Sequence, residues 1–212
     1  NPDTKVVAFV HAETSTGVRS DAKEIAEISK KYGCLVIADT VTSFTGIPVL
    51  TDDWGLDAVY SGSQKCLSCV PGLSPLTFSE KAIKKITSRG TKIQSWFLDQ
   101  TLVLDYWSGT GKRSYHHTAP VNSIYALHEA LRLACDETLE NLWQRHLSAH
   151  LRLKKGLDEM SFDFVVDKDY RLPQMNSIHI PQGYNDLEIR TKLLNDYNLE
   201  IGAGLGKFSE KI

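Results

Sequence analysis

Three polar clusters in this sequence could take part in chemistry, and each follows a short apolar run. They occupy residues 11–16, 39–43 and 61–65. In open α/β sheets, ligands bind outside the carboxyl ends of the strands. Because each cluster follows a different predicted strand, the fold can bring all three to one edge of a sheet. This convergence indicates a ligand site more strongly than any single residue does.

Lys65 is the first candidate for covalent chemistry, and it ends the turn Ser61–Gly62–Ser63–Gln64–Lys65. Small residues in such a turn let the backbone approach a ligand closely. A lysine can form a Schiff base with a carbonyl group when cationic or apolar surroundings lower its pKa. An exposed surface lysine, which is the usual state of this residue, remains an open alternative from the pattern alone.

Asp39 is the second candidate, and it closes the apolar run 34–38. A lone carboxylate at that position is costly to bury without a partner. A protonated pyridinium nitrogen is a suitable partner, and the ion pair would keep the ring cationic so that it can act as an electron sink. A helix cap or a solvated loop carboxylate is the competing interpretation.

The elements that position these clusters are predicted from apolar runs and turn residues. Asp21, with Glu24 three residues later, predicts the start of a helix that ends near Tyr32 and Gly33. A buried strand is predicted at residues 6–10, further apolar strands at 34–38 and 57–61, and a fourth strand at 76–78. Near-continuous apolar strands of this kind predict an α/β fold with a largely parallel sheet covered on both faces.

The second half of the sequence is more helical. Apolar spacing predicts helices over residues 120–135 and 138–160 and, later, over 186–196. Short strands are predicted at 177–180 and 199–201. We therefore expect a large domain over residues 1–160 and the beginning of a smaller α+β domain over residues 161–212.

Bulk composition excludes several classes of function. The chain has 212 residues and a net charge of -2, which gives no electrostatic argument for nucleic acid or membrane surfaces. No apolar run approaches the roughly 20 residues needed to span a bilayer. The four cysteines do not form the pattern of a secreted disulfide framework, which favours a reducing intracellular compartment. Cys66 and Cys69 form a Cys-x-x-Cys match without the second pair that a zinc site needs, so packing residues are the simpler interpretation.

Four short strings resemble those of a known family, the class V aminotransferases, and most closely its alanine–glyoxylate (serine–pyruvate) branch. The strings are His11–Gly17, Ala38–Ser43, Ser61–Lys65 and Tyr115–Thr118. The gap from Asp39 to Lys65, 65 − 39 = 26 residues, agrees with that branch. The resemblance runs along essentially the whole chain.

The resemblance implies a fold-type I enzyme that uses pyridoxal 5'-phosphate. Lys65 would carry the cofactor as a Schiff base and move the proton of the substrate Cα. Asp39 would pair with the pyridine nitrogen, and Val41 would pack against the ring. Thr14 would hydrogen-bond near the phenolic oxygen, and Gln64 would contact the phosphate. No metal is implied.

The resemblance also implies a homodimer, in which Tyr115 and Thr118 would reach the phosphate of the neighbouring subunit's cofactor. The family's N-terminal phosphate loop, its ring-stacking aromatic residue and its C-terminal carboxylate-binding arginine have no counterpart in this sequence. We therefore expect the chain to be a piece of a larger protein and to bind cofactor poorly by itself. The peroxisome is the favoured compartment, and the mitochondrion is the alternative.

Transamination from alanine or serine to glyoxylate or pyruvate is the reaction that the resemblance implies. A relative acting on 3-hydroxykynurenine, or another class V aminotransferase, is an alternative. Lyase or desulfurase chemistry would need a cysteine in a mobile loop, and none of the four cysteines lies in an obvious one. A degenerate, non-enzymatic copy is less consistent with the sequence, because Lys65 and Asp39 are both present.

Overall fold

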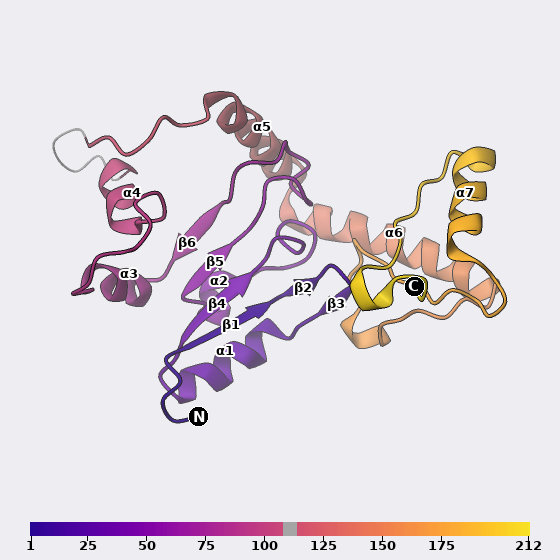
Figure 1. Cartoon of the computed structure of the whole chain (residues 1–212), viewed down its shortest axis with the longest axis horizontal. Coiled ribbons are helices and arrows are strands. Elements are labelled where there is room, and N and C mark those ends of the chain that lie inside the picture. Colours follow the sequence, from indigo (N-terminus) through magenta and orange to yellow (C-terminus); the bar gives the residue numbers. More distant parts are fainter. Residues whose placement is uncertain (108–113) are drawn as a thin grey trace.

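A four-stranded sheet forms the centre of the computed structural model, which describes residues 1–107 and 114–212 (Figure 1). The strand order is β1-β4-β5-β6. The strands are β1 (Val6–Val10), β4 (Leu35–Asp39), β5 (Ala58–Tyr60) and β6 (Leu76–Phe78). The first three run parallel, and β6 pairs antiparallel with β5. All four predicted strands and the mainly parallel character of the sheet are confirmed.

Helix α1 (Ala22–Lys31) connects β1 to β4 and begins where the sequence predicts. The Asp21 side chain accepts a hydrogen bond of 3.0 Å from the backbone N–H of Glu24, which satisfies one of the free donors at the helix start. Tyr32 ends the helix, and Gly33 follows with a φ of 71°. Glycine adopts this left-handed conformation without steric cost, so the chain can turn directly into β4.

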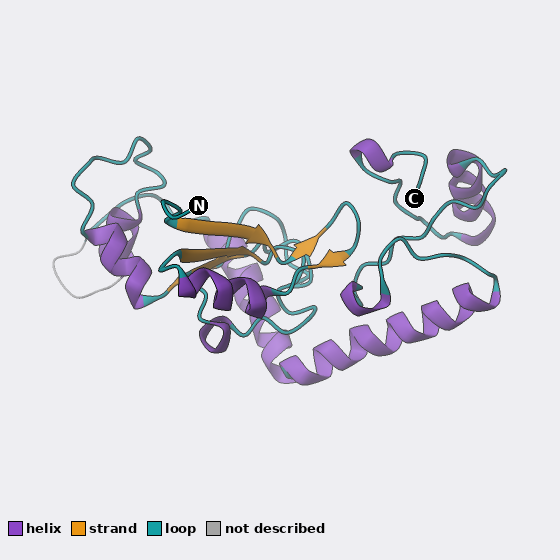
Figure 2. Cartoon of the chain, turned by 90° about the horizontal axis from the view of Figure 1, so that it is seen from below, coloured by secondary structure: helices purple, strands orange, loops and turns teal. Residues whose placement is uncertain are grey.

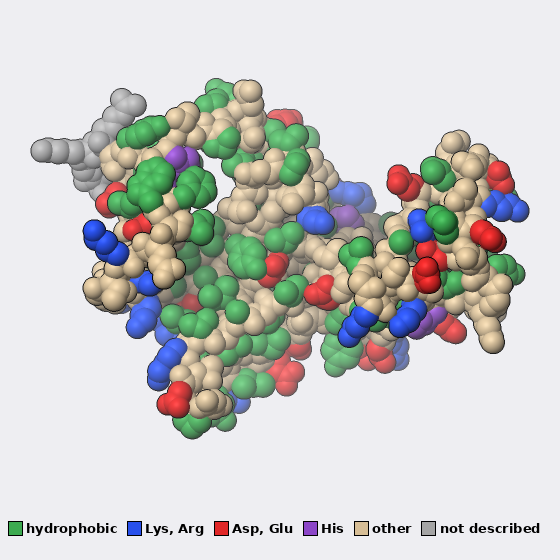
Figure 3. Space-filling view, in the orientation of Figure 1, with side chains coloured by type: hydrophobic (Ala, Val, Ile, Leu, Met, Phe, Trp, Pro, Cys, Tyr) green, Lys and Arg blue, Asp and Glu red, His purple; other side chains and the backbone are tan. Residues whose placement is uncertain are grey.

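The two faces of the sheet differ in how they are covered. One face packs against α1 and α2 (Thr51–Trp54), and its buried cluster consists of Ala26, Val36, Ala38, Leu56 and Val59. In Figure 2 the sheet is seen nearly edge-on, with α1 on one side of it. Hydrophobic side chains gather over the sheet on the face turned to the viewer in Figure 3.

That second face, called the open face below, carries four large side chains that are each more than a third exposed: Val6 (46%), Val10 (39%), Tyr60 (38%) and Leu76 (45%). The prediction of a sheet covered on both faces is therefore wrong for this chain. The physical reason is that the helices packed on its central strands lie on one side.

The remaining elements surround the sheet and lead away from it. They are β2 (Ala12–Glu13), β3 (Val18–Arg19), α3 (Glu80–Thr87), α4 (Gln100–Trp107), α5 (Val121–Glu137), α6 (Leu139–Glu159) and α7 (Asp186–Tyr197), with short 3-10 turns at Lys168–Tyr170 and Gly206–Phe208. The long helix α6 links the sheet region to the C-terminal segment (Figures 1 and 2). Across residues 1–107 and 114–212, no helix is long and apolar enough to cross a membrane.

The predicted helices α5, α6 and α7 are confirmed, but the two predicted C-terminal strands are wrong. Within residues 177–180 only Ile178 forms a β-bridge, to Phe164, through the backbone bonds from Val165 N–H to the Ser177 carbonyl at 3.1 Å and from His179 N–H to the Asp163 carbonyl at 2.8 Å. The backbone N–H of Leu199 bonds to the carbonyl of Leu193 at 3.1 Å, which closes the end of α7 instead of starting a strand. Residues 161–212 therefore form helix α7, short 3-10 turns, loops and isolated β-bridges.

Candidate functional site

The turns that follow β1, β4 and β5 meet at the carboxyl edge of the sheet. The backbone N–H of His11 bonds to the carbonyl of Asp39 at 2.9 Å, and the N–H of Thr40 bonds to the carbonyl of Tyr60 at 2.9 Å. These bonds tie the three polar clusters together. The expectation that they share one edge is confirmed.

Asp39 lies at the centre of this edge, and both of its carboxylate oxygens accept hydrogen bonds. Oδ1 accepts from the backbone N–H of Val41, and Oδ2 accepts from the hydroxyl of Tyr60, each at 2.8 Å. The bond to Asp39, followed by desolvation and the negative charge of Asp39, raises the pKa of Tyr60 above its usual value. The Val41 N–H and the Tyr60 hydroxyl therefore fix the orientation of the Asp39 carboxylate, which can still accept a hydrogen bond from a further donor.

The turn that carries Lys65 is built around Gly62. A Cβ atom added to Gly62 would lie 2.8 Å from Oε1 of Gln64 and 3.4 Å from Cγ1 of Val41. Gln64 and Val41 therefore close over a space that glycine leaves free. Behind them the buried Ser63 donates a 2.6 Å hydrogen bond to the carbonyl of Val70, which anchors the loop, while Lys65 is exposed.

The turn after β1 is held by hydroxyl contacts to the turn after β4. Oγ1 of Thr14 lies 2.9 Å from Oγ1 of Thr42, and Nδ1 of the buried His11 lies 3.0 Å from Oγ of Ser43. Burial lowers the pKa of His11 to about 4, with a smaller contribution from the positive charge of Arg19. His11 is therefore neutral near pH 7 and supports the edge from inside the fold.

Tyr115 and Thr118 are the two predicted site residues that the structure does not bring to this edge. Their side-chain oxygens lie 2.7 Å apart, on the segment that leads into α5 (Figure 1). Next to them His116 stacks on Trp96, with ring centroids 4.1 Å apart. Their contact with a neighbouring subunit's cofactor stays a prediction.

Several residues at the edge were not singled out from the sequence. The sequence pattern predicts only that Tyr60 belongs to a strand. Its contact with Asp39 depends on the strand register, which places the two residues side by side. Gln174 donates from Nε2 to the carbonyl of Thr42 at 2.9 Å, across 132 positions of sequence. No sequence signal connects residues so far apart. The contact ties the C-terminal segment to the loop after β4.

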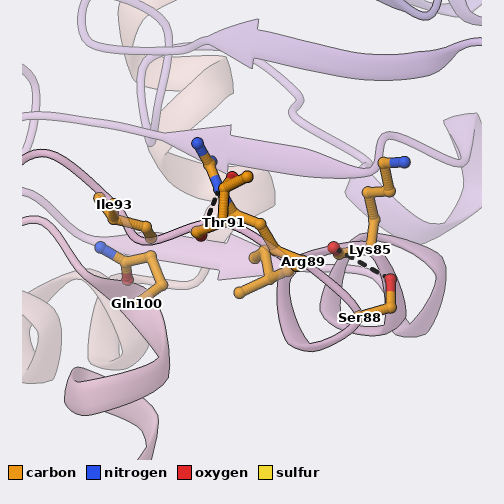
Figure 4. A pocket seen from close by; sticks show the side chains of 8 residues that line it. Lys85, Ser88, Arg89, Thr91, Ile93 and Gln100 are labelled. Atoms are coloured by element: carbon orange, nitrogen blue, oxygen red, sulfur yellow. Dashed lines mark hydrogen bonds between the residues drawn. The ribbon is translucent and has the colours of Figure 1, made fainter.

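Two hollows lie on the surface at very different distances from these residues. A partly open cavity of about 350 Å³ borders Thr14 and Ser15 and is also lined by residues 175–178, 201–205 and Ile212. A second pocket of about 480 Å³ lies between α3 and α4, where Arg89 donates from Nε to the carbonyl of Thr91 at 3.2 Å (Figure 4). Of these two, the first adjoins the predicted site, and a smaller pocket of about 150 Å³ borders Thr40, Tyr60 and Ser61 at the same edge.

Metal and disulfide chemistry find little support in the described part of the chain. All four cysteines are free: Cys34 is buried, Cys66 and Cys69 are half-buried, and Cys135 is exposed. Burial raises the pKa of the Cys66 thiol. Among residues 1–107 and 114–212, no group of three or more His, Cys, Asp or Glu side chains is arranged to hold a metal ion.

Known proteins are similar to this chain in sequence and in fold. The family model "Aminotransferase class-V" matches residues 1–207. The chain belongs to the class V aminotransferases. It is 41% identical over 206 residues to the alanine–glyoxylate aminotransferase of Rattus norvegicus, covering 96% of this chain and 50% of that protein. It is 33% identical over 226 residues to the (S)-ureidoglycine–glyoxylate transaminase of Bacillus subtilis (strain 168), covering 98% and 54%.

Solved structures of class V relatives have the same fold. The alanine–glyoxylate aminotransferase of Nostoc sp. superposes with a TM-score of 0.90 at 46% identity, over 97% of this chain and 54% of that one. The ureidoglycine–glyoxylate aminotransferase of Bacillus subtilis gives a TM-score of 0.92 at 35% identity, over 98% and 53%. The chain thus spans about half the length of the relatives it matches, and its fold is that of the fold-type I aminotransferases.

Proposed function

We propose that this chain carries the cofactor-binding core of a pyridoxal-phosphate-dependent transaminase. The reaction proposed for the whole protein transfers an amino group from alanine or serine to glyoxylate or pyruvate. The observation that carries this proposal is the meeting of the three polar clusters at one sheet edge, around Asp39 and beside Lys65. Its support from relatives is that two differently named groups both have glyoxylate in their names.

The residues at the edge fit the chemical groups of pyridoxal phosphate. Its aldehyde needs a primary amine, and the exposed Lys65 offers one. Its ring nitrogen needs an acid, which Asp39 provides, and its ring needs an apolar contact, which Val41 provides next to Gly62. The amide of Gln64 can donate to the phosphate, and Thr14 can donate to the phenolic oxygen.

Each residue then has a distinct task in the proposed reaction. When bound, pyridoxal phosphate supplies the electron sink that stabilises negative charge at the substrate Cα. Lys65 would hold the cofactor covalently and then carry the proton that leaves Cα. Asp39 would keep the ring nitrogen protonated, and Thr42 would hold the Thr14 hydroxyl in place.

The substrate side of the site is proposed to include the cavity of about 350 Å³ beside Thr14. Its walls contain apolar residues, among them Ala203 and Met175, and uncharged polar residues, among them Asn176 and Ser177, which suit a short uncharged side chain better than a charged one. This composition fits alanine or serine as the amino donor. The cavity lies between the predicted large domain (1–160) and the predicted beginning of the small domain (161–212), a division that we retain as a proposal.

Assembly and location are further parts of the proposal. We propose a homodimer in which Tyr115, 68% exposed, and Thr118 complete the partner's phosphate site. Their exposure supports this role, because a residue that serves a neighbouring chain must be accessible on its own. For location we propose an intracellular compartment, with the peroxisome ahead of the mitochondrion, on the basis of the alanine–glyoxylate resemblance.

A transamination panel tests the reaction. The complete natural polypeptide that carries this chain is loaded with pyridoxal phosphate. Alanine, serine, (S)-ureidoglycine and 3-hydroxykynurenine are then offered as donors to glyoxylate and to pyruvate. We expect alanine with glyoxylate to give the highest kcat/KM. A preference for (S)-ureidoglycine would instead point to the activity in the name of the Bacillus subtilis relative, and a preference for 3-hydroxykynurenine would support the alternative named from the sequence. No turnover with any pair would contradict the proposal.

A second experiment concerns the 212 residues alone. We expect this chain to bind pyridoxal phosphate weakly and to turn over little substrate. Reduction with borohydride, followed by peptide mass spectrometry, measures how much cofactor is attached to Lys65. Alanine–glyoxylate turnover by the isolated chain, lost in Lys65→Ala, would show that this expectation is wrong.

A further inference from the structure

Tyr60 stands beside Asp39 on the open face of the sheet. The two residues are direct partners in the parallel register of β4 and β5, so their side chains project from the same face. The Tyr60 hydroxyl donates to Oδ2 of Asp39 at 2.8 Å. Tyr60 is 38% exposed, so packing alone does not hold its ring in this position.

The bond from Tyr60 completes the restraint on the Asp39 carboxylate. Oδ1 is held by the backbone N–H of Val41 at 2.8 Å, and Oδ2 is held by Tyr60. A carboxylate restrained at both oxygens cannot rotate freely. An ionised carboxylate has about four lone-pair sites in all, so Oδ2 can still accept a second donor.

We infer that Tyr60 is a positioning residue for the cofactor's ring nitrogen, because it holds the Asp39 carboxylate in the orientation that pairs with that nitrogen. This inference rests on the proposed function. Tyr60 acts through Asp39 and touches neither the aldehyde nor the phosphate in this assignment. Its effect should therefore depend on the presence of a basic nitrogen in the ring.

The test compares two cofactors in the complete natural polypeptide. Pyridoxal phosphate has the ring nitrogen, and 1-deazapyridoxal phosphate has carbon in its place. Dissociation constants of both are measured by quenching of tryptophan fluorescence, in the wild type and in Tyr60→Phe, which removes only the hydroxyl. We expect Tyr60→Phe to weaken pyridoxal phosphate binding by about tenfold, the low end of the loss expected when a hydrogen bond to a charged group is removed, and to leave binding of the deaza analogue within about twofold.

Matched variants separate positioning from a general structural role. Tyr32→Phe removes a hydroxyl from a tyrosine that is 76% exposed at the end of α1, and it should change neither dissociation constant. In the Asp39→Asn background, Tyr60→Phe should have little further effect, because the group through which it acts is gone. Thermal unfolding of the apo forms checks that Tyr60→Phe folds as the wild type does.

The outcomes are distinct. An equal loss of affinity for both cofactors, or no loss for pyridoxal phosphate, would overturn the inference. A wild type whose Lys65 is not modified by pyridoxal phosphate after borohydride reduction would instead overturn the proposed function. Either result with the Tyr60→Phe variant would leave the proposed cofactor site in place and would remove only the role assigned to Tyr60.

Discussion

The two faces of the central sheet differ in what they carry: one packs against helices and forms the buried core, and the other carries the proposed cofactor-binding residues. On the covered face, Val36 and Ala38 are fully buried against Ala26 of α1. On the open face, Asp39 and Tyr60 meet through a hydrogen bond, and the large apolar side chains around them are partly exposed. Successive residues of one strand serve the two purposes, because side chains alternate between faces.

This division explains how a carboxylate can be presented at the end of a buried strand. Ala38 anchors β4 in the core, and the next residue, Asp39, points to the other side. Asp57 shows the contrasting arrangement: it is only 6% exposed, accepts from Val36 N–H and Ser79 Oγ, and lies 3.8 Å from Lys81. Asp57 joins strands and loops, whereas Asp39 keeps access to the open side.

The largest expected effect is at the open edge. If the proposed function holds, Lys65→Ala should lower transaminase kcat by about 10³-fold or more, because it removes the proposed covalent anchor and proton carrier. Its effect on the free energy of unfolding should stay within about 0.5 kcal/mol, because Lys65 is exposed. Steady-state kinetics and urea denaturation measure the two quantities. Lys84→Ala, on the exposed side of α3, is the control and should change neither.

Beneath the same edge, His11 should make stability depend on pH. Its folded pKa is lowered to about 4, whereas an unperturbed histidine titrates near 6.5. As the pH falls below 6.5, His11 becomes protonated in the unfolded chain but stays neutral in the folded chain. The contribution of His11 to the free energy of unfolding is therefore fully present above pH 6.5 and is lost as the pH falls toward 4. The expected loss over this window is on the order of 3 kcal/mol.

His11→Gln keeps a hydrogen-bonding partner for Ser43 but cannot titrate. Urea midpoints measured from pH 4 to pH 7 should therefore fall less steeply in this variant than in the wild type. Identical slopes would mean that His11 does not control the acid response. Asp21, whose negative charge opposes the shift, is unchanged in both proteins.

A matched pair of valines tests the difference between the faces directly. Val36→Ala, at a fully buried position of the covered face, should lower the free energy of unfolding by about 2 kcal/mol. Val6→Ala, at a 46% exposed position of the open face, should cost less than about 0.5 kcal/mol. Equal losses in urea denaturation of the complete polypeptide would show that the open face is covered in solution.

The smallest expected effect concerns the helix that seals the covered face. Asp21→Ala removes the acceptor for the Glu24 N–H and should cost about 1 kcal/mol. The exposed Asp3→Ala serves as the control for the change in charge. Thermal unfolding measures both variants, and equal midpoints would contradict the capping role.

Much of the fold near the site follows from local sequence. Residues 6–10 and 34–38 are short, apolar and rich in β-branched residues, which predicts strands, and Asp21 marks a helix start by its side chain alone. The C-terminal segment is harder, because 177–180 and 199–201 have strand-like residues but their pairing depends on distant neighbours. In the structure, the first pairs by a single bridge and the second closes a helix.

The sequence by itself determined the family, and it predicted the candidate cofactor residues from the lysine after a small-residue turn, the aspartate at a strand end and the family strings that contain them. The tertiary structure alone decided which face of the sheet is open, that Tyr60 stands opposite Asp39, and that Gln174 reaches Thr42. The physical reason is the sequence separation over which each kind of interaction acts. Turn and strand signals act over a few residues, whereas strand register and long-range contacts exist only once the chain has folded.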